Sequence, residues 1–182
     1  SGRINTTNPC SEYLFLDSTA CNLASLKLTA FLRVDGSFNV PEFQDAVRTF
    51  IIAQDILVDL SSYPTRAIAE NSHDYRTLGM GYMDLGSVLM LKGLAYDSEE
   101  GRSYAAAITS LMCATAYRTS AELAHGMGTF PGWEKNCVPM HEVLLTHWEA
   151  STRAENSAEG EAHELLSIAS NAWKDVVESS VQ

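Results

Sequence analysis

The sequence predicts a mostly helical chain with a little β-structure at its N-terminal end. From residue 41 onward, apolar residues recur at the three- and four-residue intervals of a buried helix face. Before residue 30 the apolar runs are short and lie close to turn-forming residues, which favours strands. The 182 residues suit a single domain on length alone.

The first elements are expected to be two short strands, over residues 13–16 and 23–28. Pro41 then occupies a first helical position, and a helix is predicted from it to about Leu60. Its apolar residues cover a wide face, so this helix is predicted to be buried on most sides. They are Phe43, Val47, Phe50, Ile51, Ile52, Ile56 and Leu57.

A second helix is predicted from about residue 74 to residue 92, closed by Gly93. It would contain Gly79, Gly81 and Gly86, each of which costs about 1 kcal/mol relative to Ala inside a helix. The Gly-x-Gly pair also suggests a nucleotide-binding loop, but the spacing of the dinucleotide motif is absent. Close packing of this helix against a neighbour is therefore the favoured explanation of the glycines.

The third helix is predicted to be the longest. A capping-box pattern that starts at Asp97 marks its beginning, and Gly126 can close it. Two further helices are expected over residues 139–149 and 160–180. The small and polar residues 150–159 between them are predicted to form a flexible loop.

The composition excludes several classes of function. The net charge is −11 with only twelve Lys and Arg, so the chain would repel a phosphate backbone, and no nucleic-acid partner is expected. No apolar run reaches the roughly 18 residues of a spanning helix, so no membrane role is expected. Four cysteines without a secretory signal indicate a reducing compartment and a cytoplasmic location. Because the chain starts at Ser1 and a catalytic-looking motif follows at once, we expect an interior piece of a longer protein.

The most informative segment is Asn-Pro-Cys-Ser-Glu at residues 8–12. Pro9 fixes its own φ and favours an extended conformation at Asn8. If the extended path continues, Asn8, Cys10 and Glu12 share one face. A thiol suited to one-electron or nucleophilic chemistry would then lie beside a carboxylate that can move a proton and an amide that can hold a hydroxyl. The spacing alone fits equally well an exposed polar turn before a strand.

A second cysteine, Cys21, follows in a Cys-Asn-Leu-Ala-Ser-Leu setting. Together the two segments resemble the active-site loop of ribonucleotide reductases, in particular the adenosylcobalamin-dependent class II enzymes. The short spacing from Cys10 to Cys21 favours class II over the iron-dependent class I enzymes. Later segments resemble class II sequences in the same order. They are Tyr63-Pro64-Thr65, residues 76–82, Leu85-Gly86, residues 96–102 and residues 117–122.

The resemblance implies that residues 1–182 are part of an α/β fold, a ten-stranded α/β barrel domain. The active-site loop would be residues 8–12, and the adjoining helices would occupy residues 41–182. It also implies reduction of ribonucleotides to deoxyribonucleotides by a thiyl-radical mechanism, with adenosylcobalamin as the cofactor.

The resemblance further implies a role for each residue of the motif. Cys10 would carry the thiyl radical that takes the 3′ hydrogen, and Glu12 would accept the proton of the 3′ hydroxyl. Asn8 would hydrogen-bond the substrate hydroxyls. Cys21 would form a redox disulfide with a cysteine upstream of this chain. The substrate-binding residues would be Asn8, Pro9, Cys10, Ser11 and Glu12, and no metal ligands are expected.

The implied partners are the ribonucleotide, the remainder of the reductase chain and a thioredoxin-like or glutaredoxin-like reductant, with a homodimer as a further possibility. Two expected elements are missing from these residues: the partner cysteine of Cys21 and a Pro-Thr-Gly-Thr phosphate-binding loop. The chain is therefore expected to be inactive alone. The alternative is a non-catalytic helical module, or half of a split enzyme that needs a partner chain.

Other constellations are weaker. His141 and His147 are six residues apart, which turns them roughly 240° around a helix, so they do not form a zinc pair. Cys10 and Cys21 could instead form a structural disulfide or half of a metal site, but no further Cys-x-x-Cys pair accompanies them. Cys113 is predicted to be a small buried apolar residue.

Overall fold

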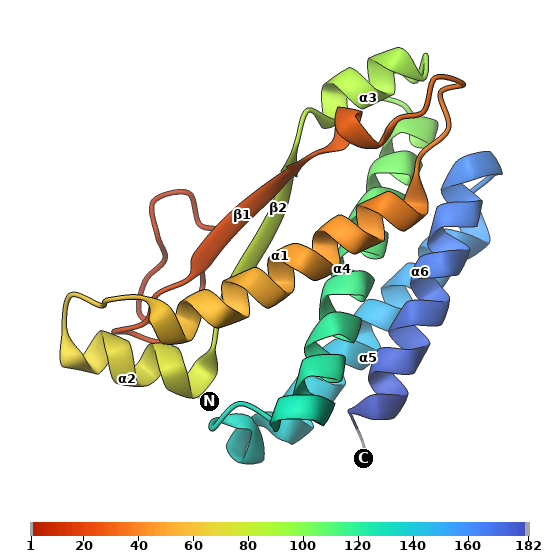
Figure 1. Cartoon of the computed structure of the whole chain (residues 1–182). Helices are drawn as coiled ribbons and strands as arrows, with labels where there is room; N and C mark the ends of the chain where they lie inside the picture. Colours follow the sequence, from red (N-terminus) through yellow and green to blue (C-terminus); the bar gives the residue numbers. More distant parts are fainter. Residues whose placement is uncertain (1, 181–182) are drawn as a thin grey trace.

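A computed structural model describes residues 2–180 as a small parallel sheet flanked by helices and joined to a bundle of long helices (Figure 1). The elements, in order, are β1 (Asn22–Lys27), η1 (Leu28–Phe31), α1 (Val40–Leu60), α2 (Arg66–Tyr75), β2 (Leu78–Met83), α3 (Leu85–Leu91), α4 (Glu99–Met127), α5 (Trp133–Ser157) and α6 (Gly160–Ser179).

The sheet consists of β1 and β2, which pair in parallel with Asn22 opposite Leu78 and Lys27 opposite Met83. Parallel neighbours need a long crossover, which α1 and α2 provide. The strand predicted over residues 23–28 is therefore confirmed. The one predicted over residues 13–16 is wrong, because those residues lie in the irregular segment that precedes β1.

The single helix predicted over residues 74–92 is also wrong. The segment contains the end of α2, all of β2 and then α3. Gly79 lies in β2, where a Cβ would stand 3.1 Å from Cys21 Sγ and would clash with the Leu23 side chain. The glycine leaves room for the Leu23 and Cys21 side chains of the neighbouring strand segment, and helix packing does not explain it.

The helix predicted to begin at Pro41 is confirmed as α1, with Pro41 in its first turn. Phe43, Val47 and Ile51 are buried against the sheet and α4. The prediction that α1 is buried on most sides is wrong, because the opposite face is exposed, including Leu60.

The longest helix within residues 2–180 is α4, as predicted. Its N-cap is Ser98, whose hydroxyl accepts a 3.0 Å hydrogen bond from the Gly101 amide, so the expected cap at Asp97 is wrong. Its C-cap is Gly128, at φ +93°, and Gly126 stays inside the helix.

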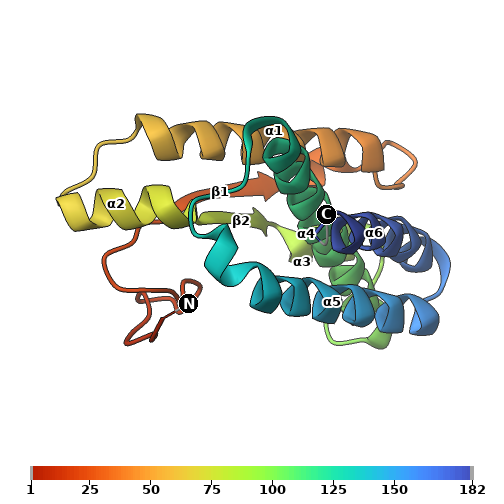
Figure 2. The same cartoon turned by 90° about the horizontal axis from the view of Figure 1, so that it is seen from below.

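Helices α5 and α6 pack against each other and against α4 (Figure 2). The flexible loop predicted over residues 150–159 is wrong, because α5 continues to Ser157. Ser151 lies buried between α4 and α6, and its hydroxyl is 2.8 Å from that of Ser110 and 3.0 Å from that of Ser170. The polar Ser151 of this stretch therefore finds its hydrogen-bond partners on the two neighbouring helices, which lets the helix continue through it.

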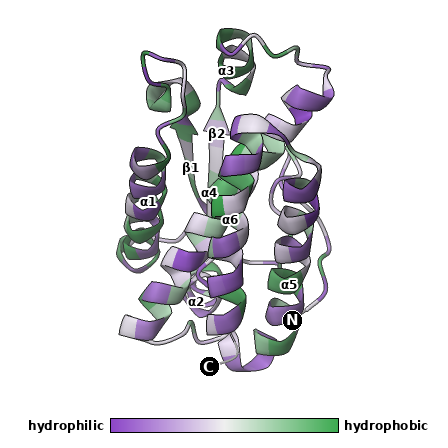
Figure 3. Ribbon diagram, turned by 90° about the vertical axis from the view of Figure 1, so that its right-hand side faces the viewer, coloured by the Kyte–Doolittle hydropathy of each residue, from purple (hydrophilic) through white to green (hydrophobic). Residues whose placement is uncertain are grey.

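Each helix carries polar and apolar residues along its length (Figure 3). Within residues 2–180, none of the helices is both long enough and apolar enough to cross a bilayer.

Candidate active site

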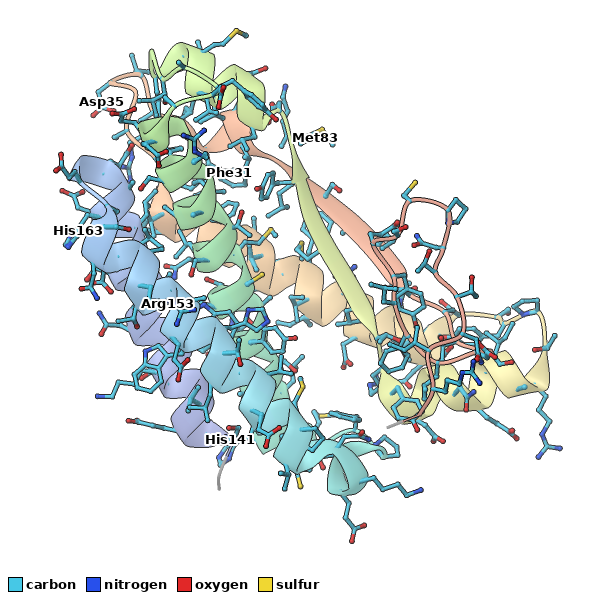
Figure 4. All side chains as sticks on the ribbon, turned by 180° about the vertical axis from the view of Figure 1, so that it is seen from behind. Phe31, Asp35, Met83, His141, Arg153 and His163 are labelled. Carbon is cyan, nitrogen blue, oxygen red and sulfur yellow. The ribbon has the colours of Figure 1, made fainter. Side chains whose placement is uncertain are left out.

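Residues 2–21 form an irregular segment that lies beside α2, at the end of the sheet away from Met83 (Figure 4). Helix α2 fixes this segment at several points. The side-chain amide of Asn71 donates to the backbone carbonyl of Asp17 at 3.2 Å. The Ser72 hydroxyl accepts from the backbone N–H of Ala20 at 3.1 Å. The Phe15 ring packs edge-on against Tyr75, with their centroids 5.5 Å apart. The segment is thus fastened to the fold between Phe15 and Ala20.

Cys10 lies on a turn, and the extended path predicted for this segment is wrong. The Ser11 amide donates to the Asn8 carbonyl at 3.1 Å, which places Pro9 and Cys10 at the two corners. Proline suits the first corner of such a turn as well as it suits an extended chain. Ser11 follows at φ +62°. The exposed polar turn of the alternative therefore describes the local backbone, although no strand follows it directly, since β1 begins at Asn22.

Asn8 and Tyr13 close the loop that carries Cys10 and Glu12. The Tyr13 amide donates to Asn8 Oδ1 at 3.0 Å, and the Asn8 amide donates to the Tyr13 carbonyl at 3.4 Å. This use of Oδ1 leaves the Asn8 NH₂ group free of any hydrogen bond to residues 2–180. Cys10 and Glu12 are both exposed on the loop. The loop therefore presents a thiol, a carboxylate and an amide donor, although the three side chains do not share the face of a strand.

The Tyr13 side chain reaches from this loop to the start of the sheet. Its hydroxyl donates to Thr19 Oγ1 at 2.8 Å and is 3.1 Å from Thr77 Oγ1. Thr77 Oγ1 is also 3.1 Å from the carbonyl of Ala20, the residue before Cys21, so its one proton serves either this carbonyl or the Tyr13 hydroxyl. Sequence reasoning did not find this residue, although a phenol three positions after Cys10 was a visible signal.

Cys21 is half-buried, immediately before β1. Burial raises the pKa of its thiol, and the nearby Glu12 carboxylate raises this pKa further. Both effects favour the neutral thiol form of Cys21. The electrostatic coupling links the Cys10 loop to the second cysteine.

A buried glutamine of α1 fixes the strands on either side of Cys21. Gln54 Nε2 donates to the carbonyl of Asn22 at 2.9 Å and to that of Gly79 at 2.8 Å. The side-chain amide of Asn22, through Nδ2, donates to the backbone carbonyl of Gln54 at 3.1 Å. Sequence reasoning missed Gln54, although a single polar residue on the apolar face of a predicted helix was a possible signal.

The four cysteines are free, so the alternative of a structural disulfide between Cys10 and Cys21 is not formed here. Cys113 is half-buried and packs against the core. Among residues 2–180, no three His, Cys, Asp or Glu side chains gather as metal ligands. A hollow of about 300 Å³ lies against the loop. Its lining is made of hydroxyl, amide and apolar groups with one carboxylate, from residues 6–8, 13 and 15–19.

Comparison with known proteins identifies the family. The family model of the ribonucleotide reductase barrel domain matches residues 1–182. The chain belongs to this family. The resemblance inferred from the Cys10 and Cys21 segments is thus confirmed.

The relatives of this reductase chain agree. It is 50% identical, over 98% of its length, to a vitamin B12-dependent ribonucleotide reductase of Rhodopirellula baltica. It is 45% identical, over 97% of its length, to a protein of that name from Streptomyces clavuligerus. A vitamin B12-dependent ribonucleoside-diphosphate reductase of Mycobacterium tuberculosis is 33% identical over 72% of the chain. The chain spans 17–19% of the length of these three relatives.

Proposed function

We propose that this chain is a segment of the catalytic chain of a vitamin B12-dependent ribonucleotide reductase, and that its loop reduces ribonucleotides to deoxyribonucleotides. The observation that carries the proposal is the exposed Cys10 turn, closed by Asn8 and coupled through Glu12 to Cys21. We further propose that residues 1–182 are part of a ten-stranded barrel. The outer edges of β1 and β2 would then pair with strands outside this chain, since each strand pairs on one edge here.

In the proposed reaction Cys10 acts first. As a thiyl radical it takes the 3′ hydrogen atom of the ribose, which re-forms the Cys10 thiol and leaves a radical at the 3′ carbon. An exposed position at the corner of a turn suits a group that must meet a substrate directly. The fixed loop supplies the position that such a transfer needs.

Glu12 and Asn8 act on the hydroxyls. The Glu12 carboxylate accepts the 3′ hydroxyl proton, and the free Asn8 NH₂ group donates to a hydroxyl oxygen. Pro9 and Ser11 shape the same turn and line the substrate. The 2′ hydroxyl leaves as water after it takes a proton from a thiol.

Cys21 supplies electrons. Cys21 and a second cysteine, from the remainder of the reductase chain, together lose two electrons and two protons and form a disulfide. One proton leaves in the water, the other proton and the two electrons pass to the substrate, where the 2′ carbon gains a hydrogen, and Glu12 returns its proton to the 3′ oxygen. Cys10 then returns a hydrogen atom to the 3′ carbon and is left as the radical again. A thioredoxin-like or glutaredoxin-like protein would reduce the disulfide for the next turnover. These thiol steps need a reducing compartment, so we propose a cytoplasmic location.

We propose adenosylcobalamin as the cofactor, on the printed names of the relatives. When bound, it supplies the radical chemistry that activates Cys10. The corrin ring of a cobalamin already holds its cobalt, so its site needs a wide pocket rather than a set of metal-ligating side chains. The hollow of about 300 Å³ beside the loop is too small for a corrinoid, so the described residues do not form the whole cofactor site, and the roles above concern this chain's own side chains.

The test distinguishes the roles of Cys10, Cys21 and Glu12. Variants of the complete reductase are supplied with 3′-tritiated ribonucleotide. Cys10→Ser should abolish tritium release and all turnover, because a hydroxyl O–H bond is too strong for the same oxidation. Cys21→Ser should still release tritium, but the substrate radical should decompose to free base for want of a reductant. Glu12→Gln should form the radical and lose water slowly, because an amide cannot accept the 3′ proton.

The matched control is Cys137→Ser, a half-buried cysteine of α5 with no proposed role, which should leave both products unchanged. Tritium release by the Cys10 variant would contradict its role. A normal yield of deoxynucleotide from the Cys21 variant under repeated turnover would contradict the role of Cys21.

The chain of residues 1–182 should not sustain turnover when it is tested alone. It holds no partner cysteine assigned to Cys21, so any electrons that Cys21 provides cannot be replaced. The measurement is deoxynucleotide formed from the chain with adenosylcobalamin, dithiol and ribonucleotide. Sustained product above background would show that these residues form a complete reductase.

A further inference from the structure

We infer that Tyr13 is a positioning residue that holds the Cys10 loop at a fixed place relative to Cys21, so that the substrate radical formed at one cysteine is reduced by the other. The inference rests on the proposed function and deepens it. Within residues 2–180 Tyr13 makes no hydrogen bond to Cys10 or Cys21. It joins the two short segments that carry them.

One end of this connection is the backbone of Tyr13. Its amide donates to Asn8 Oδ1 at 3.0 Å, and its carbonyl accepts from the Asn8 amide at 3.4 Å. These two bonds close the loop around Cys10 and orient the Asn8 side chain. Any displacement of Tyr13 therefore moves the loop as a unit.

The other end is the Tyr13 hydroxyl. It is 2.8 Å from Thr19 Oγ1, 3.1 Å from Thr77 Oγ1 and 3.5 Å from the carbonyl of Ala20. Ala20 is bonded directly to Cys21, and Thr77 directly precedes β2, which pairs with the strand that follows Cys21. The hydroxyl is thus anchored to both strands at the end of the sheet where Cys21 lies.

A packing role alone does not account for this arrangement. Tyr13 is half-buried and lies outside the main apolar core, and its ring stacks only on the nearby Phe15 among the aromatic rings, with centroids 5.9 Å apart. Phenylalanine would fill the same space equally well. The three oxygen contacts are what the hydroxyl adds, and they all lie on the Cys21 side.

The test is Tyr13→Phe in the complete reductase, which removes the hydroxyl and keeps the ring and the backbone bonds to Asn8. The readout is the ratio of free base to deoxynucleotide, because this ratio does not depend on how much of the enzyme is folded. We expect the ratio to rise by roughly 2- to 10-fold, the factor that corresponds to one net hydrogen bond. A purely structural defect would lower both products together and leave the ratio unchanged.

Thr77→Val probes the same contact from the other side and should raise the ratio similarly, while Thr77→Ser, which keeps the hydroxyl, should restore it. The double variant Tyr13→Phe with Thr77→Val should add little to either single change, since both remove one shared interaction. If the Tyr13→Phe enzyme forms no product at all, the comparison of Thr77→Val with Thr77→Ser tests the inference instead. The matched control is Tyr63→Phe, which removes a hydroxyl bonded to the Val58 carbonyl at 2.8 Å and should not change the ratio.

An unchanged ratio in both Tyr13→Phe and Thr77→Val, with an active wild-type enzyme, would overturn the inference and leave the proposed function intact. A wild-type enzyme that forms neither deoxynucleotide nor free base would instead contradict the proposed function itself.

Discussion

The two cysteines of the site have different surroundings. Cys10 is exposed at the corner of a turn, whereas Cys21 is half-buried between the loop and the first strand. Burial is the larger cause of the raised pKa of Cys21, and the Glu12 carboxylate is the second. A negative charge close to a thiol opposes the formation of a second negative charge. Glu12 therefore has an effect on Cys21 that is separate from any contact with substrate.

Glu12→Gln should make Cys21 more reactive toward iodoacetamide at a given alkaline pH. Without the carboxylate, the pKa of Cys21 falls toward its ordinary value, and the thiolate that reacts is more abundant. Burial remains, so the pKa should stay above that of an exposed cysteine. The measurement is the alkylation rate at Cys21 as a function of pH, followed by peptide mass. The control is Glu164→Gln on α6, which should not change how the alkylation rate of Cys21 depends on pH. A slower reaction of Cys21 in the Glu12→Gln variant would contradict the effect of Glu12 on its pKa.

At the scale of elements, α2 holds the active-site segment, and one arginine ties α2 to α1. Arg76 follows α2 at φ +46°, and its guanidinium bonds Asp55 Oδ1 at 2.9 Å and Asp59 Oδ1 at 2.7 Å. These bonds raise the pKa of Arg76 and lower that of Asp59. Because the pKa of the Asp59 carboxyl is depressed in the folded chain, its ionisation stabilises the fold at pH values above the ordinary carboxyl pKa. This stabilisation is lost as the pH falls through the depressed pKa of Asp59.

Arg76→Ala should release α2, with a fall of about 1–3 kcal/mol in the free energy of its local opening, the range for hydrogen bonds to charged groups. Amide hydrogen exchange along α2 measures this directly. Arg102→Ala is the matched control, because Arg102 also binds two carboxylates, those of Asp97 and Glu99, but at an exposed position. Because this group is exposed to solvent, its effect on α4 should be clearly the smaller of the two. Equal effects at the two sites would contradict the role assigned to Arg76.

How much of this could be predicted from the sequence depended on the distance between interacting residues. Helix α1 was predicted because its period and Pro41 are local signals, and Cys10 and Cys21 were found because their motif is contiguous.

Strand β2 was missed because Gly79 is explained only by β1, a partner far away in the chain. The end of α5 was missed because the polar Ser151 meets its partners on two other helices. Tyr13 and Gln54 were missed for the same reason, since their partners lie on distant segments.

At the scale of the whole molecule, apolar side chains remain uncovered on the sheet and on the helices beside it. Leu23 on β1 is 66% exposed, Leu60 at the end of α1 is 76% exposed, and Met90 on α3 is 76% exposed. Single exposed apolar residues are ordinary. These three lie on β1 and on two helices near the two ends of the sheet (Figure 1). In the barrel proposed above, further strands and helices would cover such side chains.

The chain alone should therefore self-associate and bind a dye that reports exposed apolar surface, while it keeps its helical content. Sedimentation at several concentrations and dye fluorescence measure the two effects. Replacing the exposed Met90 and Leu91 of α3 by Gln should weaken both, whereas replacing the buried Val88 and Leu89 should unfold α3 instead. A monodisperse monomer that unfolds cooperatively would favour an autonomous module over a part of a barrel.

The parallel pairing of β1 with β2 also sets the order in which the site can form during synthesis. Asn22 finds its partner at Leu78, so the sheet cannot close until the whole α1–α2 crossover has been made. Cys10 and Cys21 leave the ribosome before Thr77, Gly79 and the α2 side chains that hold their segment. Cys21 thus lacks its half-buried position until translation passes β2, whereas Cys10 is exposed before and after folding, so a reducing milieu has to prevent a disulfide between the two in the nascent chain.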